Sequence, residues 1–303
     1  MYPWPFLLIS LCLPFPIIAT DQWCYDSQSA KCGPSTWKNN HKTCGMNKQS
    51  PINIVTKKAQ FDGALSPIVF EGYDKSDTKW EIRNNGHSIQ VNVQGDITIK
   101  GGNLPNTYKA IQFHFHWGTN SLPGSEHTID GKRYPMELHI VHQNKKYTSL
   151  SEALNQPDGL AVLGFLFEES SEKNSKITNF IDILKYVAYL GNKTWLDPFP
   201  LSSMIPEEGE LDKYYRYHGS LTTPDCNEAV IWTVFEETIP ISKSQLNAFS
   251  ETLYFSDSKP MKLNFRPVQK LNVRAVYVAG SAVRLFSAVK LSVVLAIWTS
   301  VFN

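Results

Sequence analysis

The sequence predicts a mainly β, α+β fold in a single domain, and three observations favour this class. The middle of the chain contains several short runs with the composition or alternation of strands. The few helix-like patterns are short, and the helices are expected to be peripheral. No repeat, low-complexity tract or linker-like break divides the 303 residues, so one large domain is favoured over two.

Residues 1–20 are interpreted as a secretory signal peptide. Phe6–Ile18 is apolar, but Pro14 and Pro16 interrupt it and it is too short to span a bilayer, while Ala19 stands beside a suitable cleavage site. A core strand at the N-terminus is the alternative, and the two prolines disfavour it.

The number of cysteines also indicates an exported protein, independently of the signal peptide. Cys12 would leave with the signal peptide, and the mature chain keeps Cys24, Cys32, Cys44 and Cys226. An even number of cysteines in an exported protein predicts two disulfides, with three possible pairings. A zinc site built from these four is disfavoured because no Cys-x-x-Cys pair occurs.

Strand signals dominate the middle of the chain. Ser88–Val93 alternates apolar and polar residues, and Ile97–Ile99 follows across Gly95–Asp96, which predicts a hairpin. Ala161–Phe167 and Glu228–Phe235 are further strand-like runs. Short helices are expected in three places: after the capping-box pattern of Ser149 and Glu152, at Phe180, Ile183, Leu184 and Val187, and at Leu246, Phe249 and Leu253 after Ser242.

Two imidazoles stand two residues apart in Gln112–Gly118, which reads Gln-Phe-His-Phe-His-Trp-Gly. Side chains two apart share one face of a strand but not of a helix, so His114 and His116 converge only if this stretch is extended. The run Met136–His142 follows after turn dipeptides, and antiparallel pairing would bring His139 to the same place.

Three histidines without a thiolate leave one tetrahedral position open for water, which is the description of a catalytic zinc site. A lone strand histidine is more often a buried structural residue, so the residue types alone leave both interpretations open. The formal net charge is +1, without a block of like charges or a basic stripe. This balance argues against a nucleic-acid partner and fits a small substrate.

Four segments, in this order, resemble the signature blocks of the animal-type α-carbonic anhydrases. They are Gln112–Gly118, Gly124–Thr128, Met136–His142 and Gly219–Pro224. The similarity runs from about Trp23 to Val273 and is greatest to the secreted, glycolipid-anchored branch of types IV and XV. It implies a catalytic domain over residues 21–278 with a large twisted, mostly antiparallel central sheet, and reversible hydration of carbon dioxide to bicarbonate and a proton.

The resemblance implies that His114, His116 and His139 bind Zn²⁺. Gln112 and Glu137 each lie two residues before one of these ligands and would accept a hydrogen bond from its ring. A bound zinc ion lowers the pKa of water to about 7, a value known for carbonic anhydrases themselves, and the resulting hydroxide attacks carbon dioxide.

Further residues match the family's reaction machinery. Thr222 would orient the hydroxide and donate its own proton to Glu126, since an ionised carboxylate only accepts. Thr223 would contact bicarbonate, and His87, with an ordinary pKa near 6.5, would shuttle the proton to buffer. Val141, Val162, Leu221 and Trp232 match an apolar substrate pocket, and Tyr25, Asn85 and Gln90 match positions that order water. Gln90 stands where the fastest members carry Asn, so turnover is expected to differ.

The resemblance also implies the disulfides Cys24–Cys32 and Cys44–Cys226. Asn192 lies in the only glycosylation sequon, Asn-Lys-Thr. Four histidines have no metal role by spacing and are expected in structural hydrogen bonds: His41, His127, His142 and His218.

The C-terminal end changes in composition beyond the region of resemblance. Ala279, Gly280 and Ser281 form a small-residue cluster, followed by a short spacer and an apolar run of twelve residues, Leu291–Phe302. A spanning helix needs about 20 residues. Residues 279–303 are therefore interpreted as a glycolipid-anchor signal that is removed on maturation, with the lipid on one of the three small residues. A C-terminal core helix or a marginal transmembrane anchor is the alternative.

The expected location is the extracellular face of the plasma membrane. The membrane is contacted through the glycolipid, and bicarbonate or proton transporters are candidate partners. The alternatives to this enzyme are a non-catalytic carbonic-anhydrase-like binding domain, which typically lacks a metal histidine, and a zinc esterase with a larger substrate. The presence of all three histidines with Glu126 and Thr222 favours the enzyme.

Overall fold

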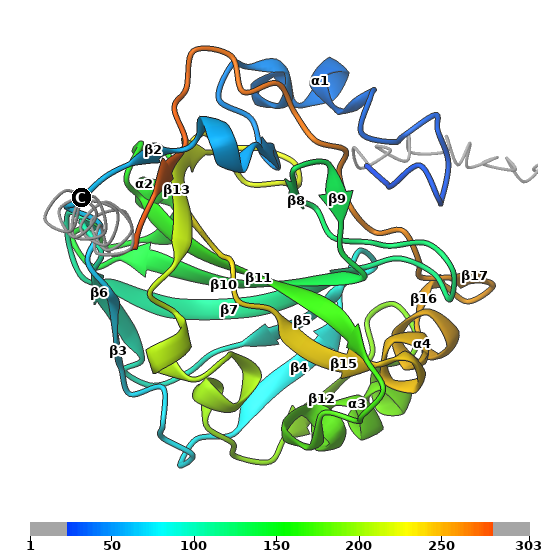
Figure 1. Ribbon diagram of the computed structural model, residues 1–303. Helices are drawn as coiled ribbons and strands as arrows, with labels where there is room; N and C mark the ends of the chain where they lie inside the picture. Colours follow the sequence, from blue (N-terminus) through cyan, green and yellow to red (C-terminus); the bar gives the residue numbers. More distant parts are fainter. Residues whose placement is uncertain (1–22, 281–303) are drawn as a thin grey trace, which may run out of the picture.

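The computed structural model describes residues 23–280, which are built around a thirteen-stranded sheet (Figure 1). Its strands are β2 (Gln60–Phe61), β3 (Ile68–Glu71), β4 (Trp80–Asn84), β5 (Ile89–Asn92), β6 (Thr98–Gly101), β7 (Tyr108–Trp117), β10 (Met136–Asn144), β11 (Leu160–Ser170), β12 (Lys193–Leu196), β13 (Tyr214–Gly219), β14 (Val230–Phe235), β15 (Ile239–Ser242) and β18 (Tyr277–Val278). Their spatial order is β12-β4-β5-β7-β10-β11-β14-β13-β18-β2, with β6 also beside β7, β3 beside β6, and β15 beside β11.

Most neighbouring strands of this sheet run antiparallel. The exceptions are β11, which pairs in parallel with β14 and β15, and β18, which pairs in parallel with β2. The expected large, mostly antiparallel sheet is therefore confirmed.

Smaller elements surround the sheet. The short strands are β1 (Asn53–Ile54), β8 (Thr128–Ile129), β9 (Lys132–Arg133), β16 (Tyr254–Ser256) and β17 (Lys259–Pro260). The α-helices are α1 (Trp37–Asn40), α2 (Leu150–Ala153), α3 (Thr178–Ile183) and α4 (Lys243–Thr252). Single 3-10 turns occupy Lys42–Gly45, Thr56–Lys58, Ser175–Ile177, Leu184–Val187, Leu201–Met204 and Glu208–Glu210. α3 and α4 pack together at one edge of the molecule (Figure 1).

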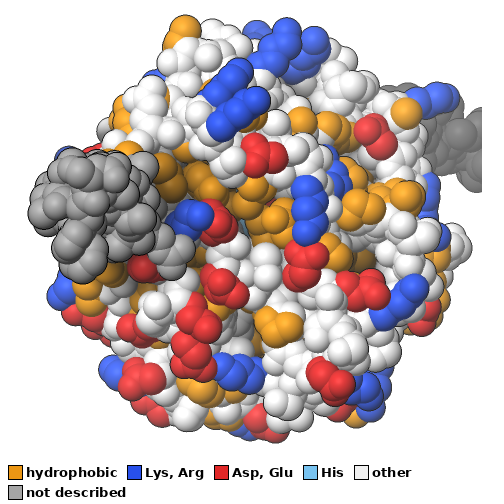
Figure 2. All heavy atoms as spheres, in the orientation of Figure 1, with side chains coloured by type: hydrophobic (Ala, Val, Ile, Leu, Met, Phe, Trp, Pro, Cys, Tyr) orange, Lys and Arg blue, Asp and Glu red, His pale blue; other side chains and the backbone are white. Residues whose placement is uncertain are grey.

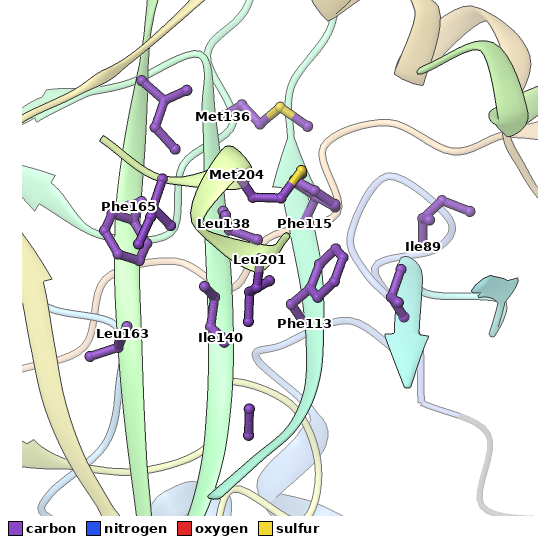
Figure 3. Packing of buried hydrophobic residues seen from close by; sticks show 14 of the residues in the cluster. Ile89, Phe113, Phe115, Met136, Leu138, Ile140, Leu163, Phe165, Leu201 and Met204 are labelled. Carbon is purple, nitrogen blue, oxygen red and sulfur yellow. The ribbon is translucent and has the colours of Figure 1, made fainter. Parts of the chain in front are cut away.

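The two faces of the central strands carry different residues. On one face, buried side chains of β7, β10 and β11 lie side by side: Phe113, Phe115, Leu138, Ile140, Leu163 and Phe165 (Figure 3). Leu201 and Met204 pack over this layer (Figure 3). Because side chains alternate along a strand, His114, His116 and His139 point to the opposite face.

The prediction of a hairpin across Gly95–Asp96 is wrong. β5 pairs with β4 and β7, and β6 pairs with β3 and β7, so both lie along β7 instead of against each other. The reason is the length of β7, whose ten residues offer Gln112–His114 to β5 and Tyr108–Lys109 to β6.

Helices occur at all three places where the sequence predicts them, although they range from four to ten residues in length. The Ser149 hydroxyl accepts the backbone N–H three residues on and starts α2. Ser242 and Gln245 form a full capping box at the start of α4. The helix expected over 180–187 consists of α3 and the 3-10 turn that follows it.

The surface is mixed in charge. Acidic and basic side chains are interspersed over the face in Figure 2, and a band of hydrophobic side chains crosses its middle. Within residues 23–280, no helix combines the length and the apolar character needed to cross a bilayer. The predicted signal peptide and nearly all of the predicted anchor signal lie outside the described residues.

Candidate metal centre

Strand pairing brings the three histidines together. β7 and β10 run antiparallel, with His114 opposite His139 and His116 opposite Glu137. The ring centroids are 5.0 Å apart for His114 and His116, 5.2 Å for His114 and His139, and 4.7 Å for His116 and His139. One ligand nitrogen from each ring lies within 4.8 Å of the other two.

Two of the imidazoles are oriented by side chains of the same strands. His114 Nδ1 lies 2.8 Å from Gln112 Oε1, and His139 Nε2 lies 2.6 Å from Glu137 Oε1. A ring nitrogen that donates to oxygen carries the proton, so the lone pair of each neutral ring is on the other nitrogen. Those nitrogens are His114 Nε2 and His139 Nδ1.

The third imidazole is oriented by a backbone carbonyl. His116 Nδ1 lies 2.8 Å from the backbone carbonyl oxygen of Asn264. His116 Nε2 is buried and has no hydrogen-bond partner among the described residues. A buried nitrogen left without a partner calls for an explanation, and a cation would supply one. Three neutral imidazole nitrogens that leave one position open fit a catalytic zinc ion.

The protonation of these rings favours metal binding. Burial lowers the pKa of His114 well below its ordinary value, and the neighbouring His116 and His139 lower it further. Burial also lowers the pKa of His116, although Glu126 partly opposes this shift. Neutral imidazole is the form that binds a metal, so the lowered pKa values of His114 and His116 favour the state that binding requires.

A second group with ligand geometry, His127, Glu137 and His139, overlaps the first. Its carboxylate is already occupied by hydrogen bonds. Glu137 Oε1 lies 2.6 Å from His127 Nδ1 and from His139 Nε2, and Oε2 accepts the backbone N–H groups of Glu126 and His127 at 2.8 Å. His127 Nε2 lies 2.7 Å from the Tyr217 hydroxyl. This group is therefore a buried network that orients His139.

Glu126 is fully buried, and its two oxygens have different surroundings. Oε1 accepts the Arg266 backbone N–H at 2.7 Å, and Oε2 is without a hydrogen-bond partner in the described part of the chain. Oε2 faces the ring of His116, with Nε2 at 3.4 Å. The hydrogen bond expected from the Thr222 hydroxyl to Glu126 is therefore not formed between these two described residues, although Thr222 is also buried.

The residues expected to wall an apolar pocket come from adjacent strands. Val141 of β10 pairs with Val162 of β11, which pairs with Trp232 of β14. They belong to one buried hydrophobic cluster, and Leu221 packs against it. The ring centroid of Trp232 lies 4.8 Å from that of His139. An apolar surface thus adjoins the three candidate ligands.

The residues expected to order water lie toward the other side of β7. Asn85 Nδ2 donates to Gln90 Oε1 at 3.2 Å, and Gln90 is opposite His114 in the sheet. Asn85 Oδ1 also accepts the His87 backbone N–H at 2.9 Å. Tyr25 is buried, with its ring centroid 6.4 Å from that of His87.

His87 stacks on Trp23, with 3.6 Å between centroids and 12° between the ring planes. Its Nδ1 is buried and has no hydrogen-bond partner within residues 23–280. Burial lowers the pKa of His87 to about 4. The value near 6.5 expected for a shuttle therefore does not hold for this stacked ring, because the ring is partly buried and its Nδ1 is shielded from water.

Both disulfides implied by the resemblance are confirmed. Cys24–Cys32 and Cys44–Cys226 have Cα–Cα distances of 5.1 Å and 4.9 Å. The Cys226 backbone N–H donates to the Thr223 carbonyl at 2.7 Å. The long-range bridge thus ties the N-terminal segment to the loop that carries Thr223.

Histidines without a metal role mostly make the hydrogen bonds expected of them. His41 Nδ1 lies 2.6 Å from Asp225 Oδ1, and His142 Nε2 lies 2.7 Å from the Tyr73 hydroxyl. His218 differs, since its side chain is exposed and its ring makes no hydrogen bond to the rest of the described chain.

The positions expected to be modified lie away from the metal centre. Asn192 is exposed in a turn before β12. Ala279 is buried, and its N–H donates to the Tyr214 carbonyl at 2.9 Å. Gly280 ends the described residues, and Ser281 lies outside them.

Sequence reasoning missed three positions that shape the site. Asn264 and Arg266 act through backbone atoms, as the acceptor of His116 and the donor to Glu126. Residue types give no signal for such contacts. Gly164 lies opposite His139 in the sheet. A Cβ at this position would lie 3.3 Å from Oε1 of Glu137, the carboxylate that orients His139. A glycine inside a strand is the signal that could have found it.

Comparison with known proteins agrees with this geometry. The family model of eukaryotic-type carbonic anhydrases matches residues 32–280. The chain is 40% identical to carbonic anhydrase 4 of Rattus norvegicus over 287 residues, which cover 92% of each protein. It is 41% identical to carbonic anhydrase 15 of Mus musculus over 91% of this chain and 88% of the relative, and 40% identical to carbonic anhydrase 12 of Homo sapiens over 86% and 74%. The chain therefore belongs to the eukaryotic-type carbonic anhydrases and is a carbonate dehydratase.

Proposed function

We propose that this chain hydrates carbon dioxide reversibly at a zinc ion held by His114 Nε2, His116 Nε2 and His139 Nδ1. The observation that carries the proposal is the convergence of three imidazole nitrogens, each ring being oriented by a hydrogen bond on its other nitrogen. When bound there, zinc supplies hydroxide from water at neutral pH.

The side chains around the ion would orient the reactants. Thr222 and Glu126 make no hydrogen bond in this structure, so the proposed role requires the Thr222 hydroxyl to turn toward Glu126 Oε2, which lacks a partner in the described chain. A threonine oxygen that donates to a carboxylate keeps lone pairs that can accept a proton from the attacking oxygen, which sets the direction of attack. Thr223 follows in the same loop and would contact bicarbonate.

The apolar residues beside the ligands suit the substrate. Carbon dioxide has neither net charge nor dipole, so it gains nothing from polar groups in its pocket. We assign it to the surface formed by Val141, Val162, Leu221 and Trp232. Burial of this surface also keeps excess water away from the reacting carbon.

We assign the release of the proton to His87. In the stacked position its pKa is about 4, so the ring is neutral at pH 7 and holds a proton too weakly to carry it. Transfer through His87 therefore requires the ring to leave Trp23 and regain water. Tyr25, Asn85 and Gln90 would order the water between His87 and the metal.

The proposed location is the extracellular membrane surface. The two disulfides fit an oxidising compartment, and the apolar run at residues 6–18 fits export. For the glycolipid we favour Gly280 or Ser281, because Ala279 is buried and hydrogen-bonded. Bicarbonate or proton transporters remain candidate partners. Release from cell membranes by a glycolipid-specific phospholipase supports the anchor, and retention contradicts it.

The decisive experiment for the activity uses the purified protein. Carbon dioxide hydration and zinc content are measured before metal removal, after it and after zinc is restored. The proposal predicts one zinc ion per chain and activity that is lost and regained with the metal. A folded protein that binds zinc but does not hydrate carbon dioxide would favour the non-catalytic binding domain instead.

A further inference from the structure

We propose that an N-linked glycan on Asn192 packs against the exposed ring of Tyr189 and completes the turn that precedes β12. The inference rests on the proposed passage through the secretory pathway, where such glycans are attached. Asn192 carries the only sequon of the 303 residues, so any N-linked glycan on this chain is at this position.

Tyr189 and Asn192 are the two ends of one β-turn. The Asn192 backbone N–H donates to the Tyr189 carbonyl at 2.9 Å, and the Tyr189 N–H donates to Asn192 Oδ1 at 3.1 Å. The second bond fixes the plane of the Asn192 amide. Its Nδ2, the atom that takes the sugar, has no hydrogen-bond partner among the residues described here.

The turn is held by the sheet below it. The Gly191 N–H donates to the Asn84 carbonyl at 2.9 Å, and the Asn84 N–H donates to the Asn192 carbonyl at 3.0 Å. These bonds continue the ladder between β4 and β12. Gly191 has φ +82°, a conformation that glycine adopts without strain. The attachment point therefore has a defined direction before any sugar is present.

The Tyr189 ring is also held in place by its neighbours before any sugar is present. Tyr254 stacks against it, with 5.1 Å between centroids and 23° between planes, yet Tyr189 remains 43% exposed. The face of an aromatic ring is electron-rich and complements the C–H groups of a pyranose. Because ring and turn are already ordered, the contact costs little additional conformational entropy.

Among the partners that could cover this exposed aromatic ring, the glycan has an advantage of position. A sugar linked three residues away in the same tight turn is present at a high effective concentration, whereas a separate protein has to be recruited from solution. Leu190, between the two residues, is also more than half exposed and widens the apolar surface available to the sugar.

The test compares glycosylated protein from a eukaryotic host with the same preparation treated with peptide N-glycosidase, which leaves Asp at position 192. We expect a loss of mass on treatment and a fall in Tm of roughly 2–4 °C. In Tyr189→Ala the same treatment should lower Tm by less than half as much. Tyr186→Ala is the matched control, since Tyr186 is an exposed tyrosine on the preceding 3-10 turn, and it should keep the full effect.

Each outcome of this double comparison decides the proposal. Coupling between the glycan and Tyr189, but not Tyr186, supports it. The absence of a mass change, an equal fall in Tm in wild type and Tyr189→Ala, or no fall in either overturns it. The readouts are mass and Tm, so their failure leaves carbon dioxide hydration, the test of the proposed function, unaffected.

Discussion

The candidate metal centre and the His87 loop lie close together but hold their histidines in different ways. Each ring of His114, His116 and His139 has one nitrogen in a hydrogen bond of 2.6 to 2.8 Å. His87 instead stacks on Trp23, and its buried Nδ1 bonds to no other described residue. Hydrogen bonds fix the direction of a lone pair, whereas stacking fixes only the plane of a ring. The first arrangement suits a ligand, and the second suits a group that has to move.

The largest effect is expected from removing a ligand. His114→Ala should abolish zinc binding at micromolar zinc and reduce carbon dioxide hydration to background, because two imidazoles do not hold a catalytic zinc ion. Metal content and hydration rate are measured on the same sample. His218→Ala is the control, since His218 is an exposed histidine outside the site. Full activity in His114→Ala would refute the ligand assignment.

A smaller effect is expected from the orienting carboxylate. Glu137→Gln keeps the shape of the side chain but removes the charge that accepts from His139 and His127. Zinc affinity should fall about 10- to 100-fold, with the fold retained. Competition with a fluorescent chelator measures the affinity. Unchanged zinc affinity would show that the network around Glu137 does not support the metal centre.

The stacked histidine gives a prediction about pH. In Trp23→Ala the His87 ring should regain water, and its pKa should rise from about 4 toward 6.5, as followed by NMR. Trp195→Ala, which removes an exposed tryptophan on β12, should leave this pKa unchanged. A His87 pKa that stays near 4 in Trp23→Ala would mean that Trp23 does not cause its desolvation.

The same shift links His87 to stability. The unfolded chain binds a proton on this histidine near pH 6.5 and the folded chain only near pH 4, so the contribution of neutral His87 is complete above about pH 6.5 and is lost as the pH falls toward 4. Denaturation curves between these pH values should be less pH-dependent for Trp23→Ala than for wild type.

The smallest effect is expected at Gly164. An alanine Cβ there would lie 3.3 Å from Glu137 Oε1, so the carboxylate has to shift by a few tenths of an ångström. Zinc affinity should fall, but by less than in Glu137→Gln. A larger loss than in Glu137→Gln would mean that the alanine disturbs more than this carboxylate.

The histidine side of the site was predictable because its geometry is local. A period of two in Gln112–His116, and the same period from Glu137 to His139, places each acceptor beside its ligand whatever the rest of the chain does. The third acceptor was not predictable, since it is the carbonyl of Asn264, 148 residues from His116. Backbone atoms are common to all residues and leave no mark in the sequence.

The fold shows the same division between local and long-range information. Capping at Ser149 is local and was recognised from the sequence. The hairpin predicted at Gly95–Asp96 does not form, because β5 and β6 each pair with β7 instead of with each other. A turn signal in the sequence does not show which strands will pair. The pKa of His87 was missed for a similar reason, since Trp23 stands 64 residues before it in the sequence and stacks on it in the fold.

A crystal structure of the zinc-loaded protein would show directly whether the three imidazole nitrogens bind the ion. We expect one ion bound by His114 Nε2, His116 Nε2 and His139 Nδ1 at about 2.0–2.1 Å, with the fourth position held by a solvent oxygen. A zinc ion bound between His127, Glu137 and His139, or a fourth ligand atom supplied by the protein at the first site, would contradict it.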